Sequence, residues 1–194
     1  MRRTEAKAEK RKKRAMGIFI VVIMTMSVLG YMFGKDSTEQ SDYNDFKFYQ
    51  SGNKWATKID DNEYVFNFFP SQVENINVSS DIISRLDDSL QIDMTSDVDS
   101  EYKEAIALAE FELSGYLFYN EQYARLGFTE LNEYEKPKIT CLDSTFSVPV
   151  ILFEKSNETI IYSEGNCIIA NAKSESDIVA IKDRLLYGLI GVMD

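Results

Sequence analysis

A run of twenty residues without a charged side chain, residues 15–34, constrains this sequence more than any other feature. As a helix rising about 1.5 Å per residue it would extend about 30 Å, which matches the hydrocarbon core of a bilayer. A cleaved signal peptide is the alternative, but its apolar region is only about 7–15 residues long and ends at a small-residue cleavage site. The residues that follow the apolar run 16–33 offer no such site. The sequence therefore predicts a retained transmembrane helix.

Charge is divided sharply on either side of this run. Residues 1–15 have a net charge of +6, whereas residues 16–194 have a net charge of −17. Basic residues that flank a span are retained on the cytoplasmic side, so the tail 1–14 is expected inside, where it would also attract anionic membrane lipid. The tail could instead bind RNA or a cytoplasmic partner, but topology already accounts for its charge. The rest of the chain is expected outside the cell membrane, and its acidic surface argues against nucleic-acid binding.

The acidic part of the chain begins with a polar segment and continues as one domain. Residues 35–45 lack apolar periodicity and are interpreted as a linker. Residues 46–194 have the length and the apolar content of a single domain with its own core. The expected organisation is a basic cytoplasmic tail (1–14), a transmembrane helix (15–34), the linker, and an extracytoplasmic domain.

Short aromatic and β-branched runs open this domain. They alternate as strands do and are separated by turn residues, so they predict a β-meander with strands at residues 46–50, 54–59 and 63–69. Large rings on one face of a strand are usually core, because each buries about 150–250 Å². Trp55 and Tyr64, whose rings carry a polar end, remain candidates for a surface site that stacks sugars or extended polymers.

The remainder of the domain combines helices with strands. Apolar periodicity predicts helices over residues 80–88 and 101–123, and a final helix that starts at Ser174 with Asp177 in the position of a capping-box acid. Helix 101–123 is apolar on most of its circumference, so we expect it to be largely buried against a sheet. The further strands are expected at residues 90–95, 138–142, 148–154, 159–163 and 166–172. The predicted fold class is α+β, with one transmembrane helix plus a single mixed sheet domain packed by two main helices.

The last third of the domain carries a resemblance to a protein family. It contains GNCII at residues 165–169 and KDRLLY at residues 182–187, behind a basic tail and one apolar span. In these features it is similar to small uncharacterised membrane-anchored proteins of archaeal type. The resemblance implies no activity and assigns no functional residue.

Cys141 and Cys167 are the only cysteines, and the expected topology places both outside. An oxidising exterior and an even count favour a disulfide, for which two predicted strands would have to bring the Cα atoms within about 4.4–6.8 Å. Two buried thiols are an alternative, and redox chemistry is another, although no C-x-x-C motif is present. Asn77 and Asn157 begin N-x-S/T triplets and are candidate glycosylation sites of an outward-facing domain.

The sequence contains no histidine. This removes Ser-His-Asp and Cys-His nucleophile pairs and every metal site that needs imidazole. The acidic segment 97–101 does not fit a calcium loop, because Tyr102 and Leu108 stand where that loop requires glycine and glutamate. The sequence also lacks a phosphate or nucleotide loop. We therefore expect no enzyme activity, no metal and no cofactor.

The leading hypothesis is a non-enzymatic, membrane-anchored extracytoplasmic domain that interacts or assembles with envelope components. Its expected partners are membrane lipid and a protein of the envelope. An envelope hydrolase is one alternative, since glycosidases need only two suitably spaced carboxyl groups. Available carboxylates include Asp60, Asp61, Asp87, Asp88, Asp143 and Glu164. A ligand-binding sensor module is the other alternative, and pairing of the chain with itself is left open.

Overall fold

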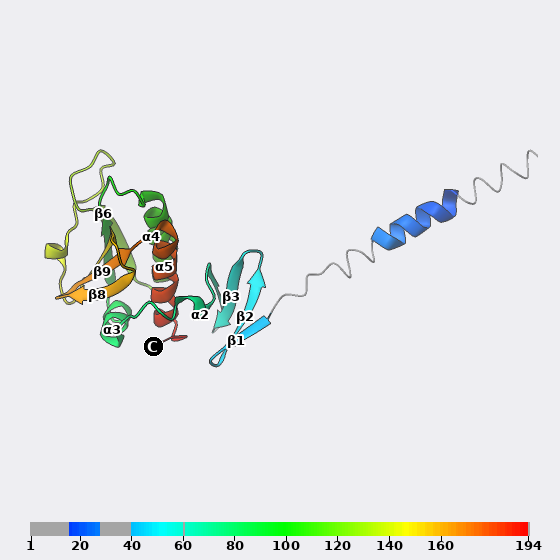
Figure 1. Cartoon of the computed structure of the whole chain (residues 1–194), viewed down its shortest axis with the longest axis horizontal. Helices are drawn as coiled ribbons and strands as arrows, with labels where there is room; N and C mark the ends of the chain where they lie inside the picture. The colour runs from blue at the N-terminus through cyan, green and yellow to red at the C-terminus, as the bar shows by residue number, and fades with distance from the viewer. Residues whose placement is uncertain (1–15, 28–39, 60, 194) are drawn as a thin grey trace, which may run out of the picture. The chain divides into compact units, whose positions relative to one another are not determined.

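The computed structural model describes residues 16–27, 40–59 and 61–193 (Figure 1). Contacts within the chain divide it into two units, Met1–Glu39 and Gln40–Asp194. In the first unit, residues 16–27 form a helix. The described strands and the other described helices belong to the second unit.

Of the predicted span 15–34, the structure describes residues 16–27, which form a helix. Within the part of the chain that the structure describes, no helix is both long enough and apolar enough to cross a membrane. This contradicts the predicted transmembrane helix over residues 15–34, together with the single-pass cell-membrane location and topology that rested on it. The basic tail, residues 1–14, and residues 28–39, which hold the end of the predicted span and the start of the linker, lie outside the described residues.

The second unit contains two sheets, so the prediction of a single mixed sheet is wrong. The first sheet is an antiparallel meander in the order β1-β2-β3-β4. Its strands are β1 Gln40–Tyr43, β2 Phe46–Ser51, β3 Lys54–Ile59 and β4 Asn62–Phe66. The last three lie at the predicted positions, whereas β1 lies in the segment assigned to the linker. Asn44, at a φ of 50°, forms the tight turn that brings β1 back against β2.

The second sheet is mostly parallel, in the order β6-β5-β7-β9-β8. Its strands are β5 Gln91–Ser96, β6 Tyr123–Phe128, β7 Val150–Lys155, β8 Ile160–Glu164 and β9 Cys167–Ala172. Only β8 runs antiparallel to its neighbour within this sheet. The chain passes from β5 to β6 on one side and then to β7 on the other side, so the strand order reverses between β5 and β7. Crevices at the carboxyl ends of strands beside such a reversal are where open α/β sheets bind ligands.

The helices of this unit lie between the strands in sequence. They are α2 Pro70–Val73, α3 Ser80–Asp87, α4 Lys103–Tyr119 and α5 Glu175–Leu189, and a 3₁₀ turn, η1, spans Cys141–Asp143. The start of α5 is the predicted one, because the backbone N–H of Asp177 donates to Ser174 Oγ at 3.2 Å. This hydrogen bond satisfies one of the free N–H groups in the first turn.

Two further elements are shorter in the structure than the sequence predicted. The helix expected over residues 101–123 stops at Tyr119, and Glu121 takes a positive φ of 60° that turns the chain into β6. The strand expected over residues 138–142 is reduced to one isolated bridge at Lys138, which η1 follows.

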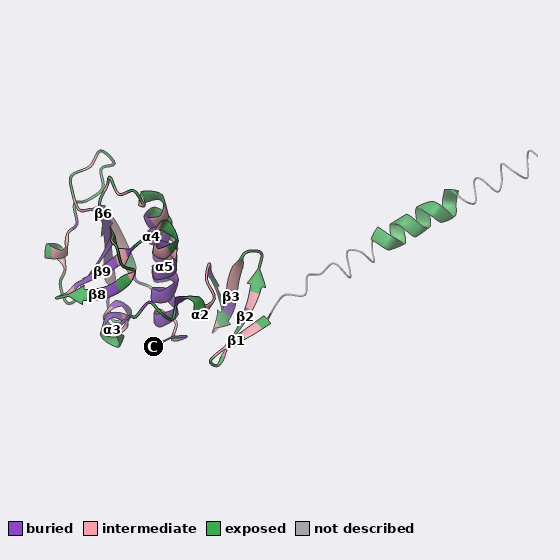
Figure 2. Ribbon diagram, in the orientation of Figure 1, coloured by how far each residue is buried: buried purple, intermediate pink, exposed green. Residues whose placement is uncertain are grey.

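Helix α5 lies at the centre of the core. It packs on β9 of the parallel sheet and on α4, and its Tyr187 ring contacts Phe48 and Phe66 of the meander. As a result α5 is buried along most of its length (Figure 2). The opposite face of the parallel sheet has a smaller core, in which Ile139 covers Val150 of β7.

Candidate functional site

The outer side of α4 carries large apolar side chains that the described chain leaves uncovered. Leu108, Phe111, Phe118 and Tyr119, here called the α4 ridge, are 47%, 73%, 77% and 81% exposed. At 3.6 residues per turn, these four side chains and Gly115 fall within roughly 100° of the helix circumference. The rings of Phe118 and Tyr119 meet edge to face, with centroids 6.2 Å apart. An exposed apolar patch of this kind is typical of a protein interaction site.

Helix α4 is apolar on its inner side as well. Ile106, Ala109, Leu113 and Leu117 are buried in the main core. The sequence predicted a largely buried helix, and that prediction is wrong for the outer side, which nothing in the described second unit covers. A helix that is apolar all round is normally surrounded by protein. The α4 ridge is therefore an apolar surface that no other part of the described second unit covers.

A cavity of about 430 Å³, here called the Tyr64 pocket, adjoins the ridge. It lies between α4 and the edge strand β4, and Gly115 and Tyr119 of α4 form part of its wall. The rings of Tyr64 and Tyr116 lie 6.0 Å apart in this wall. Burial, together with nearby Tyr64 and a carboxylate of α3, raises the pKa of Tyr116 to about 12, so its hydroxyl stays protonated.

Glu112, on the same side of α4, lies between two lysines. Its Oε1 is 3.1 Å from Lys54 Nζ, and its Oε2 is 2.6 Å from Lys182 Nζ. Burial acts to raise the pKa of Glu112, but the two ammonium groups outweigh it and lower that pKa. Lys182 also pairs with Asp183, the next residue of α5. This network joins β3, α4 and α5, and its groups already have ionic partners.

A second cavity, here called the Glu110 pocket, lies on the other side of the α4 ridge. It has a volume of about 380 Å³ and is formed by α4, by the carboxyl ends of β5 and β6, and by the loop after β6. The rings of Phe128 and Tyr134 line it, with centroids 5.9 Å apart. The lining is mainly apolar, and the charged side chains Lys103, Glu104 and Lys136 stand at its exposed rim.

Glu110 is the buried polar group of this pocket. The residue is 8% exposed, and its Oε1 has no hydrogen-bond partner among the described residues. Burial raises the pKa of Glu110 to about 7, and Lys136 offsets this only in part. The carboxyl group is therefore partly ionised near neutral pH. Its ionised form can accept a hydrogen bond from a ligand, and its protonated form can donate one.

A third hollow, of about 530 Å³, lies where the strand order reverses between β5 and β7. Asp97, Glu101 and Glu154 make it acidic, and Lys155 pairs with Glu101 while lying 5.6 Å from the Tyr102 ring centroid. Among the described residues, no group of three or more Asp, Glu or Cys is placed to hold a metal ion. The hollow is open and polar, so a ligand bound there would bury less apolar surface than a ligand in the Glu110 pocket.

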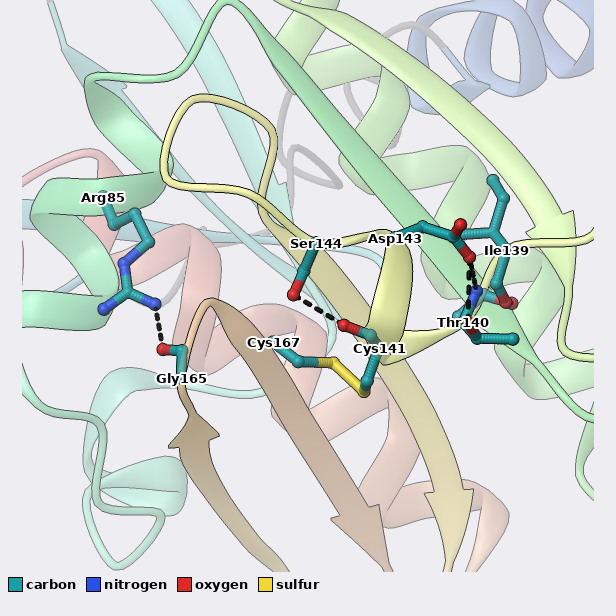
Figure 3. The surroundings of a disulfide bond; sticks show 9 residues. Arg85, Ile139, Thr140, Cys141, Asp143, Ser144, Gly165 and Cys167 are labelled. Carbon is teal, nitrogen blue, oxygen red and sulfur yellow. Dashed lines mark hydrogen bonds between the residues drawn. A yellow bond between two sulfur atoms is a disulfide. The ribbon is translucent and has the colours of Figure 1, made fainter.

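Cys141 and Cys167 form a disulfide at the amino-terminal edge of the parallel sheet, with Cα atoms 5.2 Å apart (Figure 3). Cys167 begins β9, but Cys141 lies in η1, not in a strand as predicted. Asp143 shapes η1 by accepting hydrogen bonds from the N–H and the hydroxyl of Thr140, at 2.8 and 2.9 Å. These hydrogen bonds lower the pKa of Asp143. The bridge fastens the segment before β7 to the sheet, away from the two pockets that flank α4.

Of the other residues singled out from the sequence, Trp55 and Tyr64 lie on the paired strands β3 and β4, whereas Asn77 and Asn157 lie in separate loops. Trp55 is half-buried with its ring centroid 4.8 Å from that of Phe69, so it belongs to the packing of the meander. Tyr64 lines a pocket. Asn77 and Asn157 are both exposed, the first before α3 and the second between β7 and β8.

The carboxylates considered for a hydrolase also lie in different places. Asp61 is at the Tyr64 pocket, Asp88 is beside α3, and Asp143 is held by Thr140. Asp60 lies outside the described residues. Sequence reasoning missed Glu110, although a charged residue four positions after Ile106 and three before Leu113 falls on the buried side of a helix.

Comparisons with known protein families, with characterised proteins and with solved structures find no significant match to this chain.

Proposed function

We propose that this chain is a non-enzymatic assembly module that pairs with a second copy of itself through the α4 ridge. The observation that carries the proposal is the exposure of Phe111 and Phe118, at 73% and 77%, on a helix whose inner side is already buried. Burying such rings against a partner removes apolar surface from water, which favours association. The proposal needs no particular location of the chain.

The ridge is complementary to itself when two α4 helices run antiparallel. The two-fold axis of such a pair crosses the outer side of α4 at the level of Leu113. Leu108 of one copy then lies beside Phe118 of the other, and Phe111 lies beside Gly115. Each contact then occurs twice, as a closed dimer requires. Phe111 meets Gly115, which has no side chain, so the two helices can approach closely near the two-fold axis.

Gly115 supports this pairing. Glycine in a helix interior costs about 1 kcal/mol relative to alanine. A Cβ built at Gly115 would meet no atom of the described chain within 4 Å, so packing inside one copy does not require glycine there. In the proposed dimer the missing side chain leaves space for the Phe111 ring of the partner copy.

The hydrolase alternative has less support. Glu110 does have the raised pKa expected of a general acid. A glycosidase also needs a second carboxyl group across the cleft. The pocket's other carboxylate within the described structure is Glu104, which comes from the same helix, whereas the opposite wall carries Phe128, Tyr134 and Lys136.

Single-cysteine variants of the full chain test the antiparallel pairing. Leu108→Cys and Phe118→Cys are prepared separately and mixed under mild oxidation, and products are resolved on a non-reducing gel. We expect a cross-linked dimer only in the mixture, because within a dimer of one variant the two cysteines are about 15 Å apart. The native cysteines are already joined to each other. Cross-linking of each variant alone would indicate parallel pairing, and no cross-link in any sample would refute the proposal.

Sedimentation equilibrium with a matched pair of variants tests the contribution of the ridge. Phe111→Asp should convert the dimer to monomer, because it places a charge in the apolar contact. Phe146→Asp is the control, since Phe146 is 79% exposed but lies outside α4. Any association caused by other parts of the chain persists in both variants. Equal dissociation constants for the two variants would contradict the proposed surface.

A further inference from the structure

We propose that the Glu110 pocket binds a small primary amine with an apolar body, whose ammonium group donates a hydrogen bond to the carboxyl group of Glu110. This inference is independent of the dimer, because the pocket lies beside the α4 ridge and is not part of it. It adds a small-molecule site to a chain proposed to act through protein contacts.

The position and shape of the pocket favour a small ligand. It lies at the carboxyl ends of β5 and β6, on the sheet edge where open α/β sheets bind ligands, and it is next to the strand-order reversal between β5 and β7. Its volume of about 380 Å³ falls within the range of small-molecule sites, roughly 300–1,000 Å³. Ile106, Phe128 and Tyr134 provide apolar surface for the body of a ligand.

Glu110 supplies the polar contact. A buried acceptor without a partner is uncommon in folded proteins, because nothing replaces the water that it has lost. Oε1 of Glu110 is such an acceptor among the described residues, and Glu110 is one of the residues that line the cavity. A ligand that brings a donor to this carboxyl group supplies a hydrogen bond that the described chain does not, and a charged donor makes the stronger bond.

The surroundings favour a cation over an anion. The faces of aromatic rings such as Phe128 and Tyr134 attract ammonium groups. Residues 16–194 carry a net charge of −17, which raises the local concentration of cations. Lys103 and Lys136 oppose this effect, but both side chains are exposed at the rim and screened by solvent.

Calorimetric titration of the full chain with three probes of matched shape tests the proposal. The probes are 2-phenylethylamine, 2-phenylethanol and phenylacetate. We expect the amine to bind at least about tenfold more tightly than the alcohol, and phenylacetate to bind most weakly. Glu110→Gln should remove the preference for the amine, whereas Glu104→Gln, which changes an exposed acid at the same rim, should keep it. Near-UV circular dichroism checks that both variants are folded.

The pH dependence identifies the group that holds the amine. The titratable groups around Glu110 are Lys103 and Glu104 on α4 and Tyr134 and Lys136 on the loop, while β5 and β6 contribute none to the pocket. Glu110 has a pKa of about 7. Affinity for the amine should therefore rise about tenfold between about pH 6 and about pH 8, and this rise should be absent in Glu110→Gln.

Lys136→Gln separates the amine site from an anion site. It removes a cation that competes for Glu110, so it should strengthen binding of 2-phenylethylamine above about pH 8, where the carboxyl group of Glu110 is mostly ionised. If phenylacetate binds best and Lys136→Gln weakens it, the pocket recognises anions and the proposal is wrong. Failure of all three probes to bind would also overturn it.

Discussion

The ring of Tyr187 on α5 stacks on the ring of Phe66 on β4, with centroids 4.0 Å apart and planes inclined by 22°. The Tyr187 hydroxyl also donates to the carbonyl oxygen of Phe68 at 2.6 Å. Oδ2 of Asp183, one turn earlier on α5, accepts hydrogen bonds from the N–H groups of Asn67 and Phe68, each at 2.8 Å. The segment after β4 is thus bound to α5 by both ring stacking and hydrogen bonds.

Substitutions at Tyr187 separate these two contributions. Tyr187→Phe keeps the stacked ring but leaves the Phe68 carbonyl without its partner, so it should lower the unfolding free energy by about 1–3 kcal/mol. Tyr187→Leu also removes the aromatic contacts with Phe48 and Phe66 and should cost clearly more, about 3–5 kcal/mol. Urea denaturation measures both values. Equal losses would mean that the stacked ring contributes little.

Glu110→Gln should stabilise the fold at neutral and alkaline pH. The pKa of Glu110 rises from 4.5 to about 7 on folding, so the folded state holds this proton more tightly than the unfolded state does. The associated stability is fully present below about pH 4.5 and is lost as the pH rises through about 7. At about pH 8 the variant should exceed the wild type by about 1–3 kcal/mol, with no difference near pH 4. Urea denaturation across this range measures the effect, and Glu104→Gln, at an exposed site, should follow the wild type.

Loss of the disulfide should destabilise the fold without unfolding it at room temperature. Cys141 and Cys167 are 26 residues apart in sequence, and closing a loop of that length contributes about 3–4 kcal/mol in the chain-entropy description. The double variant Cys141→Ala and Cys167→Ala should show this loss in urea denaturation. The wild type under reducing conditions should show a similar loss, and a large difference between the two would indicate that the substituted side chains, not the bond, cause the effect.

Alanine at two glycines should have opposite effects. A Cβ at Gly127 would lie 2.5 Å from the Pro137 carbonyl oxygen and 2.7 Å from Ile139, so Gly127→Ala should cost about 1–3 kcal/mol through overpacking. A Cβ at Gly115 meets nothing within 4 Å in the described chain, so Gly115→Ala should stabilise α4 by up to about 1 kcal/mol. Thermal melts of dilute samples, at which the proposed dimer dissociates, measure both. Destabilisation by Gly115→Ala would show a constraint on α4 within one copy.

Sequence reasoning worked where one or two residues decide the local structure. Ser174 has a side-chain oxygen at the right place to cap α5, and the structure uses it. Gly52, in the predicted turn after residues 46–50, takes a φ of 62° between β2 and β3. Such signals act over a few residues and do not depend on the rest of the fold.

Elements that depend on distant partners were missed. The polar segment Gln40–Tyr43 becomes a strand because its backbone pairs with β2, not because of its own side chains. In β6, Arg125 is half-buried and pairs with Asp93 of β5 across the parallel ladder. No local pattern indicates that contact, so periodicity alone predicts that the helix continues to Tyr123.

The candidate site was hidden for a related reason. Periodicity identifies apolar side chains, but it does not indicate which of them another element will cover. Leu113 and Phe111 look alike in the sequence, and only the packing of α4 leaves the first at 2% exposure and the second at 73%. The same limit applies to Glu110, whose burial depends on β5, β6 and the loop that closes over it.

Helix α5 follows every strand of both sheets in the chain. During synthesis from the amino terminus, the meander and the parallel sheet are therefore complete before the helix that buries their inner faces has emerged from the ribosome. Until α5 has been synthesised, water or a chaperone must cover core side chains such as Phe48, Phe66 and Ile168. Stalled or truncated nascent chains that lack α5 would consequently be prone to aggregate.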